Sequence, residues 1–378
     1  MHEALPVVPE ASSGVSLEVP SLAIPEISIV EKFSHNPIVR PCDVKPSRPD
    51  FEVVCAFNAG ATSHQGETFL MLRVAERPIS EPGWIATAAL DAGTGETRVL
   101  RFRLDDPDLQ EHDARGLVYR GVKYLTTLSH LRLARSRDGR HFVIDEVPTL
   151  TGSGVYETFG LEDARMVWLE GWCYISFTGV SEWGVVTCLR RTRDFRTFEK
   201  WPVMFAPDNK DIALFPEKIG GRYYTLHRPA VKHVGVMAIW LASSDNLRDW
   251  GDHRALIAPR KGYWDSERVG AGASPIKTAE GWLELYHASD ENVRYCTGAV
   301  LLDLEEPWRV IARSEKPFFV PDQPYEMSGF LPNVIFHNGY VEREPGLFDL
   351  YYGAADELTC GGTVKVADIL DSLRTCRL

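Results

Sequence analysis

The sequence predicts an all-β protein, and more specifically a five-bladed β-propeller. Short aromatic strands that begin with a glycine recur five times, and several are followed by a second strand that ends in a small polar turn. Helical patterns are scarce. Strands repeated radially around an axis produce this kind of self-similarity. A large β-sandwich is the alternative, because it also contains aromatic strands and polar turns. Five copies of one local pattern favour the propeller.

Each repeated strand continues from its glycine into aromatic and branched residues, which suit a buried strand. The last four copies begin at intervals of 50, 60 and 65 residues, which fits one blade of about four strands with its loops. The longer interval before the second copy predicts additional strands there. The copies are GETFLMLRV (66–74), GWCYISFTG (171–179), GRYYTLHRP (221–229), GWLELYHAS (281–289) and GLFDLYYGAAD (346–356).

Small polar residues follow the second strand of several repeats. Serine, threonine and aspartate side chains in such turns bond to nearby backbone groups and close a hairpin. The residues predicted to do this are Ser136, Asp138, Thr192, Asp194, Ser244 and Asp245.

One helix and one domain are predicted. The segment 366–374 places Val366, Ile369, Leu370 and Leu373 at helical spacing. Residues 1–34 begin with a stretch rich in proline and serine and are expected to form an N-terminal arm. No linker interrupts the remainder, so residues 35–378 are predicted to be a single propeller domain.

The charge and composition narrow the function. A formal net charge of -12 without a compensating basic block argues against a nucleic-acid partner or an anionic membrane surface, and favours a neutral ligand. The seven cysteines are widely spaced and form no CxxC pair, so we expect buried free thiols in a cytoplasmic protein. The eleven histidines show neither HxH nor HExxH spacing, and no nucleotide-binding fingerprint is present, so no metal and no cofactor are predicted.

An acidic pair, Glu162 and Asp163, stands at the start of a predicted strand in FGLEDARMVW (159–168). One interpretation is that either carboxylate pairs with Arg165 and closes a turn. The other is that the pair faces a common pocket, because equivalent positions of other repeats are also polar. Those polar residues are Asn58, Arg73, His227, Arg228, Asp265, Glu267, Arg268, His287 and Asp356. Aromatic residues suited to sugar rings stand near them, namely Trp183, Tyr263, Trp264 and Tyr325.

These motifs resemble glycoside hydrolase family 130, which contains β-mannoside phosphorylases and β-1,2-mannosidases built as five-bladed propellers. The resemblance covers nearly all of residues 35–366. The departures are Ala59, Ala164, Ala273 and Ser274, which stand where prolines are expected or common. The motifs are NPIVRP (36–41), FNAG (57–60), GLEDAR (160–165), KDIALFPEKIGGRYYTLHRP (210–229), WDSERVGAGASPIKTAEGWLELYH (264–287) and YYGAAD (351–356).

The resemblance implies that Asp163 is the general acid of an inverting reaction and acts through a mannose hydroxyl. Such an acid must be protonated near neutral pH, and repulsion from Glu162 is expected to raise its pKa. The resemblance and the pattern of polar residues together predict a substrate-binding set. That set is Asn58, Arg73, Glu162, Lys210, His227, Arg228, Asp265, Arg268 and Asp356.

Two nucleophiles are possible in this family, water and phosphate. Residues 166–189 contain no lysine, arginine or histidine to hold a phosphate, while Glu182 and Glu267 could activate water. We therefore expect a hydrolase that releases mannose from β-1,2-linked manno-oligosaccharides. The alternative is a phosphorylase with inorganic phosphate as co-substrate, held by Lys210, His227 and Arg228, that produces α-mannose 1-phosphate.

Three further expectations concern other functions and partners. A non-catalytic carbohydrate-binding propeller is disfavoured by the paired acids. Five-bladed furanosidases lack the motifs around residues 213–224 and 264–272. The expected partner is a β-mannoside oligosaccharide, and a homo-oligomer is possible.

Overall fold

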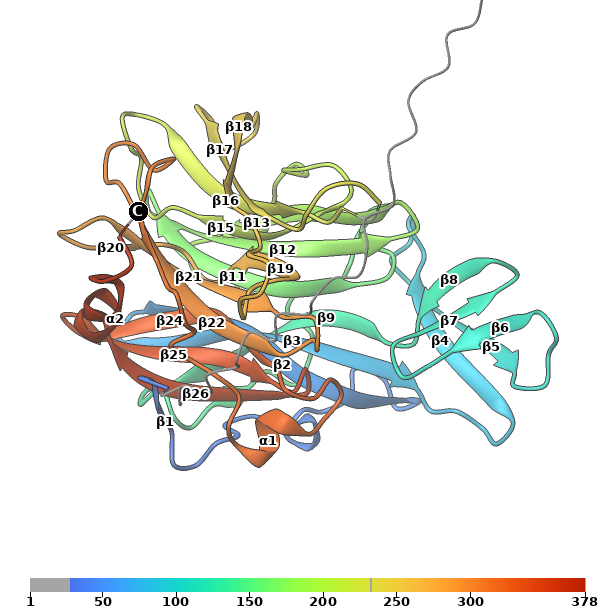
Figure 1. Ribbon diagram of the computed structural model, residues 1–378. Helices are drawn as coiled ribbons and strands as arrows, with labels where there is room; N and C mark the ends of the chain where they lie inside the picture. Colours follow the sequence, from blue (N-terminus) through green and yellow to red (C-terminus); the bar gives the residue numbers. More distant parts are fainter. Residues whose placement is uncertain (1–27, 232, 378) are drawn as a thin grey trace, which may run out of the picture.

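The computed structural model describes residues 28–231 and 233–377, which are arranged almost entirely in antiparallel β-sheets (Figure 1). The predicted all-β class is therefore confirmed. This part of the chain contains five sheets of four or five strands and two smaller ones. Of the predicted N-terminal arm, residues 1–27 lie outside the described residues.

The five larger sheets follow one another along the chain. The first has the order β10-β9-β3-β2 and consists of β2 (Phe51–His64), β3 (Glu67–Pro78), β9 (Leu128–Ser136) and β10 (Val143–Ile144). The second has the order β11-β12-β13-β14 and consists of β11 (Leu161–Leu169), β12 (Trp172–Ser181), β13 (Gly184–Thr192) and β14 (Glu199–Lys200). The third has the order β15-β16-β17-β18 and consists of β15 (Asn209–Leu214), β16 (Tyr223–Pro229), β17 (Ile239–Ser244) and β18 (Gly251–Ile257).

The last two larger sheets follow the same plan. The fourth has the order β19-β21-β22-β23 and consists of β19 (Arg268–Ala271), β21 (Trp282–Ser289), β22 (Tyr295–Leu302) and β23 (Val310–Arg313), with β20 (Ile276–Lys277) paired to β21. The fifth has the order β1-β26-β25-β24 and consists of β24 (Ile335–Glu344), β25 (Leu347–Ala354), β26 (Leu358–Lys365) and β1 (Glu31–Lys32). The N-terminal strand β1 thus completes the last sheet.

All five glycine-led strands occupy the same place in their sheets, second from one edge, as β3, β12, β16, β21 and β25. This predicted equivalence is confirmed. The preceding glycine has a positive φ, for example 80° at Gly66 and 77° at Gly171, in the tight turn from the edge strand. Such backbone angles are strained for residues with a Cβ, which explains the repeated glycine.

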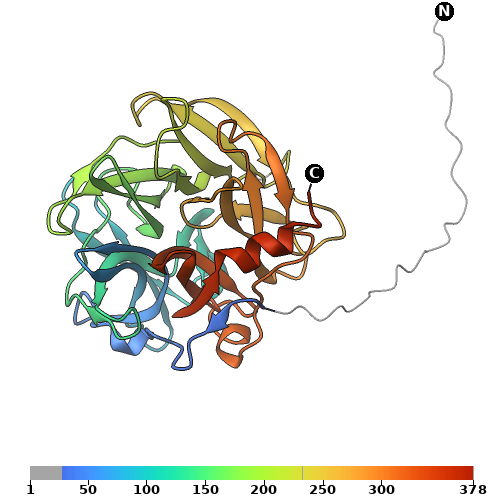
Figure 2. The ribbon, with the colours of Figure 1, turned by 90° about the vertical axis from the view of Figure 1, so that its left-hand side faces the viewer.

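The edge strands β2, β11, β15, β19 and β24 are called the inner strands here. β2 contacts both β11 and β24, β11 contacts β15, and β15 contacts β19. The order of the sheets around the molecule follows the sequence, so that the first and last sheets are neighbours (Figure 2). Polar side chains on the inner strands are therefore brought together from distant parts of the sequence.

The hydrophobic core lies between neighbouring sheets. One cluster unites Leu285 and Leu301 of the fourth sheet with Leu350 and Tyr352 of the fifth. All residues of β21 are buried, and nearly all of β12, because each sheet packs against a neighbour on both faces. The runs of aromatic and branched residues follow from this two-sided burial.

The predicted extra strands between the first two glycine-led strands are present as an insertion between β3 and β9. It extends from the end of the molecule opposite α2 (Figure 1). The insertion comprises the hairpin β4 (Trp84–Leu90) and β5 (Thr97–Arg103), and the sheet β6 (Leu109–His112), β7 (Gly116–Tyr119) and β8 (Val122–Leu125).

In the part of the chain that the structure describes, helical structure is limited to a 3₁₀ turn at Pro41–Asp43, the short α1 (Pro324–Met327) and the predicted C-terminal helix α2 (Val366–Leu373). Val366, Ile369 and Leu373 of α2 are buried, as their spacing predicts, whereas Leu370 is only partly buried. No helix in residues 28–231 and 233–377 is long and apolar enough to cross a membrane.

Two smaller expectations need correction. The turn after β17 is closed by Ser244 and Asn246, whereas Asp245 pairs with Arg222 on the surface. The cysteines are all free, but Cys42 is exposed and Cys376 only partly buried, so buried thiols describe the other five.

Candidate active site

A β-bulge interrupts inner strands β2, β11, β15 and β24 at the level where their polar residues lie. Three bulge residues have left-handed backbones, with φ of 46° at Asn58, 53° at Asp163 and 55° at Asp211. Asparagine and aspartate tolerate this conformation better than most residues, and a bulge re-aims its side chain. The bulges therefore gather polar groups from successive sheets at one place.

The acidic pair is held by Arg73 from β3. Arg73 Nη2 lies 2.7 Å from Glu162 Oε1, and Arg73 Nη1 lies 3.0 Å from Asp163 Oδ1. Asn58 Nδ2 donates a further hydrogen bond of 2.9 Å to the same Asp163 oxygen. Arg165 does not pair with either carboxylate but donates to the main-chain carbonyl of Asp163 at 2.9 Å. The acids are thus fixed in place by a neighbouring sheet.

The expected rise in the pKa of Asp163 is not found. Burial does raise this pKa, but the charges of Arg73, Lys210 and Arg165 outweigh burial and hold it below its ordinary value. The prediction was wrong because it considered only repulsion from Glu162, whose charge Arg73 neutralises at close range.

Asp356 shows the opposite behaviour at the same site. It is half-buried in the turn after β25, with a φ of 52°. Burial raises the pKa of Asp356 to about 6, and the charges of Asp163 and Glu162 act in the same direction, while Arg73 and Lys210 oppose them. The site thus contains two acids with different pKa values. That of Asp163 is lowered, and that of Asp356 is about 6.

A group of cationic residues lies beside the acids. Lys210 is the register partner of Arg228 on the pair β15 and β16, and its charge acts on both Asp163 and Asp356. Arg228 Nη2 lies 3.0 Å from Asp211 Oδ2, and His287 Nε2 lies 3.2 Å from the same oxygen. Two arginines, Arg228 and Arg165, and the imidazole of His287 therefore face the carboxylate of Asp211.

Arg228 is buried, yet much of its guanidinium is unused. Its Nε and Nη1 have no hydrogen-bond partner within the described part of the chain. Buried charged donors are nearly always satisfied, so these two nitrogens are available to donate to a bound acceptor. Burial lowers the pKa of His287 to about 4, against the effect of Asp211, so this imidazole is neutral at physiological pH.

Several predicted residues lie apart from these groups or have protein partners. Glu182, in the turn between β12 and β13, and Glu267, just before β19, are both exposed. Asp265 is fully buried and pairs with Arg260 at 2.8 Å and Arg313 at 2.7 Å. Asp265 therefore belongs to a structural ion cluster with Arg260 and Arg313.

The two remaining predicted residues have aromatic neighbours. His227 stacks on Phe205 with ring centroids 4.2 Å apart, and its Nδ1 lies 3.0 Å from Asn209. Arg268 is half-buried beside Tyr295, and its Nε has no hydrogen-bond partner among the residues described. The substrate-binding roles of His227 and Arg268 stay predictions.

Sequence reasoning did not single out Asp211, which collects Arg165, Arg228 and His287. A sequence pattern could have identified Asp211 as an equivalent of Asp163. KDIA (210–213) and EDAR (162–165) both place an aspartate after a charged residue and before a small or apolar one on an inner strand. Both aspartates occupy a bulge.

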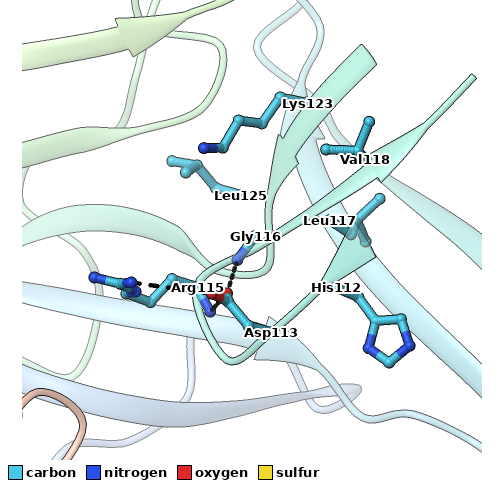
Figure 3. A pocket seen from close by; sticks show the side chains of 8 residues that line it. All are labelled: His112, Asp113, Arg115, Gly116, Leu117, Val118, Lys123 and Leu125. Atoms are coloured by element: carbon cyan, nitrogen blue, oxygen red, sulfur yellow. Dashed lines mark hydrogen bonds and ion pairs between the residues drawn. The ribbon is translucent and has the colours of Figure 1, made fainter. Parts of the chain in front are cut away.

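A separate pocket of about 430 Å³ lies on the insertion, as Figure 3 shows. Its charged lining includes Asp113, Arg115 and Lys123, all from β6 to β8 and their turns. None of the residues grouped around Asp163 lines it. This pocket is therefore not part of the candidate active site, which consists of the residues grouped around Asp163. Among the residues described, no group of acidic, histidine or cysteine side chains is arranged to hold a metal ion.

Comparison with known proteins defines the class to which this fold and acid pair belong. The sequence pattern of the family described as beta-1,4-mannooligosaccharide phosphorylase, glycoside hydrolase family 130, matches residues 115–375. The chain belongs to glycoside hydrolase family 130.

Particular relatives are phosphorylases by name. A beta-1,2-mannobiose phosphorylase of Listeria innocua is 44% identical over 349 residues, which cover 91% of this chain and 98% of the relative. A 1,2-beta-oligomannan phosphorylase of Thermoanaerobacter is 38% identical, covering 67% of this chain and 86% of the relative. The structure of the Listeria innocua enzyme in complex with beta-1,2-mannobiose superposes with a TM-score of 0.88, covering 92% of this chain and 99% of that one.

The expectation of a hydrolase is contradicted by these relatives. A solved structure described with the family's hydrolases of β-1,2 linkages is only 22% identical, with a TM-score of 0.68, and supports the fold alone. The expectation rested on the absence of cations from residues 166–189. The structure supplies cations from other strands instead, with Lys210 on β15 and Arg228 on β16.

Proposed function

We propose that this protein is an inverting mannoside phosphorylase that cleaves β-1,2-linked manno-oligosaccharides with inorganic phosphate. The buried guanidinium of Arg228, with two unpartnered nitrogens beside Lys210, carries the proposal, because a phosphate dianion supplies both the missing acceptors and the opposite charge. The 44% identical beta-1,2-mannobiose phosphorylase supports both the reaction and the linkage.

The reaction assigns a role to each group. A phosphate oxygen attacks the anomeric carbon, the bond from that carbon to the bridging oxygen breaks, and α-mannose 1-phosphate forms with inversion. The leaving sugar takes a proton from Asp163, by way of a mannose hydroxyl. Arg73 and Asn58 hold this acid in place, and Glu162 in turn accepts a hydrogen bond from Arg73.

Phosphate binding also explains how Asp163, whose pKa is lowered, becomes protonated for catalysis. Lys210 and Arg165 are among the charges that keep this carboxyl ionised. A bound dianion beside Lys210 offsets them, so phosphate binding is expected to raise the pKa of Asp163 and to favour the protonated form that catalysis needs. Substrate binding thus prepares the acid.

The architecture that supports this site is proposed to be a five-bladed β-propeller. Five sheets with equivalent strand order, inner strands in contact with one another and an N-terminal strand that joins the last sheet all favour it. Closure by a strand from the other end of the chain removes the exposed sheet edge that separate blades would leave. A cytoplasmic location also stays a prediction from the sequence.

Product analysis tests the function. The enzyme is incubated with β-1,2-mannobiose and β-1,4-mannobiose, each with and without phosphate, and mannose and mannose 1-phosphate are quantified by ion chromatography. We expect mannose 1-phosphate only with phosphate, and faster from the β-1,2-linked substrate. Equal mannose release without phosphate would show that water is the nucleophile, and no turnover under any condition would favour a binding protein.

A further inference from the structure

Arg165 is buried at the meeting point of three inner strands. Its Nη1 donates to the carbonyl of Asp163 on β11 at 2.9 Å, and its Nε donates to the carbonyl of Gly272 after β19 at 2.9 Å. Its Nη2 donates to the carbonyl of Ala271 at 3.0 Å and to Asp211 Oδ1 on β15 at 3.3 Å. One side chain therefore connects β11, β15 and the end of β19.

The backbone at Asp163 needs such support. The bulge between Glu162 and Arg165 leaves Asp163 outside the register of the ladder with β12, so its carbonyl has no place in that ladder. Its left-handed φ of 53° is unfavourable for a residue with a Cβ. Arg165 supplies the donor that this carbonyl otherwise lacks and so holds the bulge that aims the Asp163 carboxyl.

The same guanidinium reaches the cationic side of the site. Asp211 receives Arg165 on one carboxylate oxygen and Arg228 and His287 on the other. Its own backbone is left-handed, with a φ of 55°, at the equivalent bulge of β15. One bulge carries the acid, and the other carries Asp211, which pairs with Arg228. The two are joined through the contact of Arg165 with Asp211.

We propose that Arg165 is a positioning residue that fixes the general acid Asp163 and, through Asp211, the phosphate-binding Arg228 in one common frame. This inference rests on the proposed phosphorylase function. The planar fork of arginine suits the role, because four acceptors around one plane are satisfied together. A lysine at the same place keeps the positive charge but cannot reach four acceptors in fixed directions.

Two substitutions separate geometry from charge. Arg165→Lys keeps the charge, so we expect kcat to fall at least ~10-fold with the KM for β-1,2-mannobiose nearly unchanged, since the acid is displaced but sugar contacts remain. Arg165→Met removes the charge as well, so the pKa of Asp163 should rise. The limb of the pH profile of kcat that reports Asp163 should therefore move to higher pH in this variant only. A purely structural arginine would lower stability without a shift of that limb.

Arg132→Lys is the matched control. Arg132 is also fully buried and donates to a main-chain carbonyl, that of Lys45, at 2.6 Å, but it lies on β9 away from the acid pair. We expect it to lower the melting temperature while leaving kcat and its pH profile at parental values. If the Arg165 variants do not fold, Asp211→Asn, which keeps the shape, should still lower kcat and raise the KM for phosphate.

The outcomes are distinguishable from a failure of the proposed function. Phosphate dependence of the parent enzyme tests the function, whereas the ratio of variant to parental turnover tests Arg165, whichever nucleophile is used. A folded Arg165→Lys variant with parental kcat, or a folded Asp211→Asn variant with parental kcat and parental KM for phosphate, would overturn the positioning role.

Discussion

Asn58 Nδ2 donates a hydrogen bond of 2.9 Å to Asp163 Oδ1, and the two residues stand at equivalent bulges of neighbouring inner strands, β2 and β11. Both have left-handed backbones, and they are separated by more than a hundred residues in the chain. The acid is therefore positioned by contacts between sheets and not by its own strand alone.

Loss of the acidic proton at Asp163 should abolish most turnover. Asp163→Asn preserves the shape but cannot donate a proton to the leaving sugar, so we expect kcat to fall at least ~100-fold while KM changes little. Steady-state kinetics with β-1,2-mannobiose and phosphate measures both. Near-parental kcat in this variant would refute the assignment of the acid.

Arg228 should determine the affinity for phosphate. Arg228→Lys keeps a charge beside Asp211 but removes the two unpartnered guanidinium donors, so the KM for phosphate should rise at least ~10-fold with a smaller change in the KM for mannobiose. Arg222→Lys is the control, because Arg222 adjoins the same strand but pairs with surface acids. Unchanged phosphate kinetics in Arg228→Lys would contradict the site.

Asp356 should make stability and substrate binding depend on pH. Its folded pKa of about 6 lies above the ordinary aspartate value, so between about pH 4 and 6 the folded state binds more protons than the unfolded state. Its contribution to stability is therefore fully present below about pH 4 and is lost as pH rises through 6.

The measurement is a series of melting curves for the parent and Asp356→Asn between pH 4 and 8. The parent should lose stability relative to the variant as pH increases through 6, and the KM for mannobiose should show a transition near the same pH only in the parent. A difference in melting temperature that does not vary with pH would exclude a raised pKa at Asp356.

Asp265 should support the fold more than the reaction. Its carboxylate is fully buried between Arg260 and Arg313 and also accepts from Tyr286 Oη at 3.0 Å. Removing one partner of such a cluster leaves buried charges uncompensated, so Asp265→Asn should cost about 3–5 kcal/mol of unfolding free energy. Chemical denaturation measures this cost. A large increase in KM with unchanged stability would instead restore the predicted substrate-binding role.

Glu182 and Glu267 offer a test of the corrected nucleophile. Both are exposed, and a phosphorylase requires no second carboxylate to activate water. Glu182→Gln and Glu267→Gln should therefore retain phosphorolysis within a few-fold of the parent rate. Complete loss of activity in either variant would be incompatible with this account.

The fold was largely predictable because its signal is local and repeated. A glycine with positive φ before each second strand leaves a mark in the sequence five times, and two-sided burial leaves runs of aromatic and branched residues. The convergence of Asn58 and Arg73 on Asp163 followed from polar positions in different repeats.

The electrostatics of the site were not predictable in the same way. The ionised state of Asp163 depends on Arg73, which is adjacent in space but 90 residues away in sequence. The cations beside the acids come from β15 and β16, so their absence from residues 166–189 carried no information about phosphate. The ionised state of Asp163 and the position of the cations both depend on distances between sheets, which cannot be read from a linear pattern of residues.

The central claim, that phosphate and not water attacks the sugar, is tested most directly by oxygen isotopes. β-1,2-Mannobiose is treated with the enzyme and fully ¹⁸O-labelled phosphate in ordinary water, and the products are analysed by mass spectrometry. The account predicts α-mannose 1-phosphate that retains all the phosphate label, including the oxygen bonded to the anomeric carbon. Two molecules of unlabelled mannose from each mannobiose, with the labelled phosphate unconsumed, would contradict it.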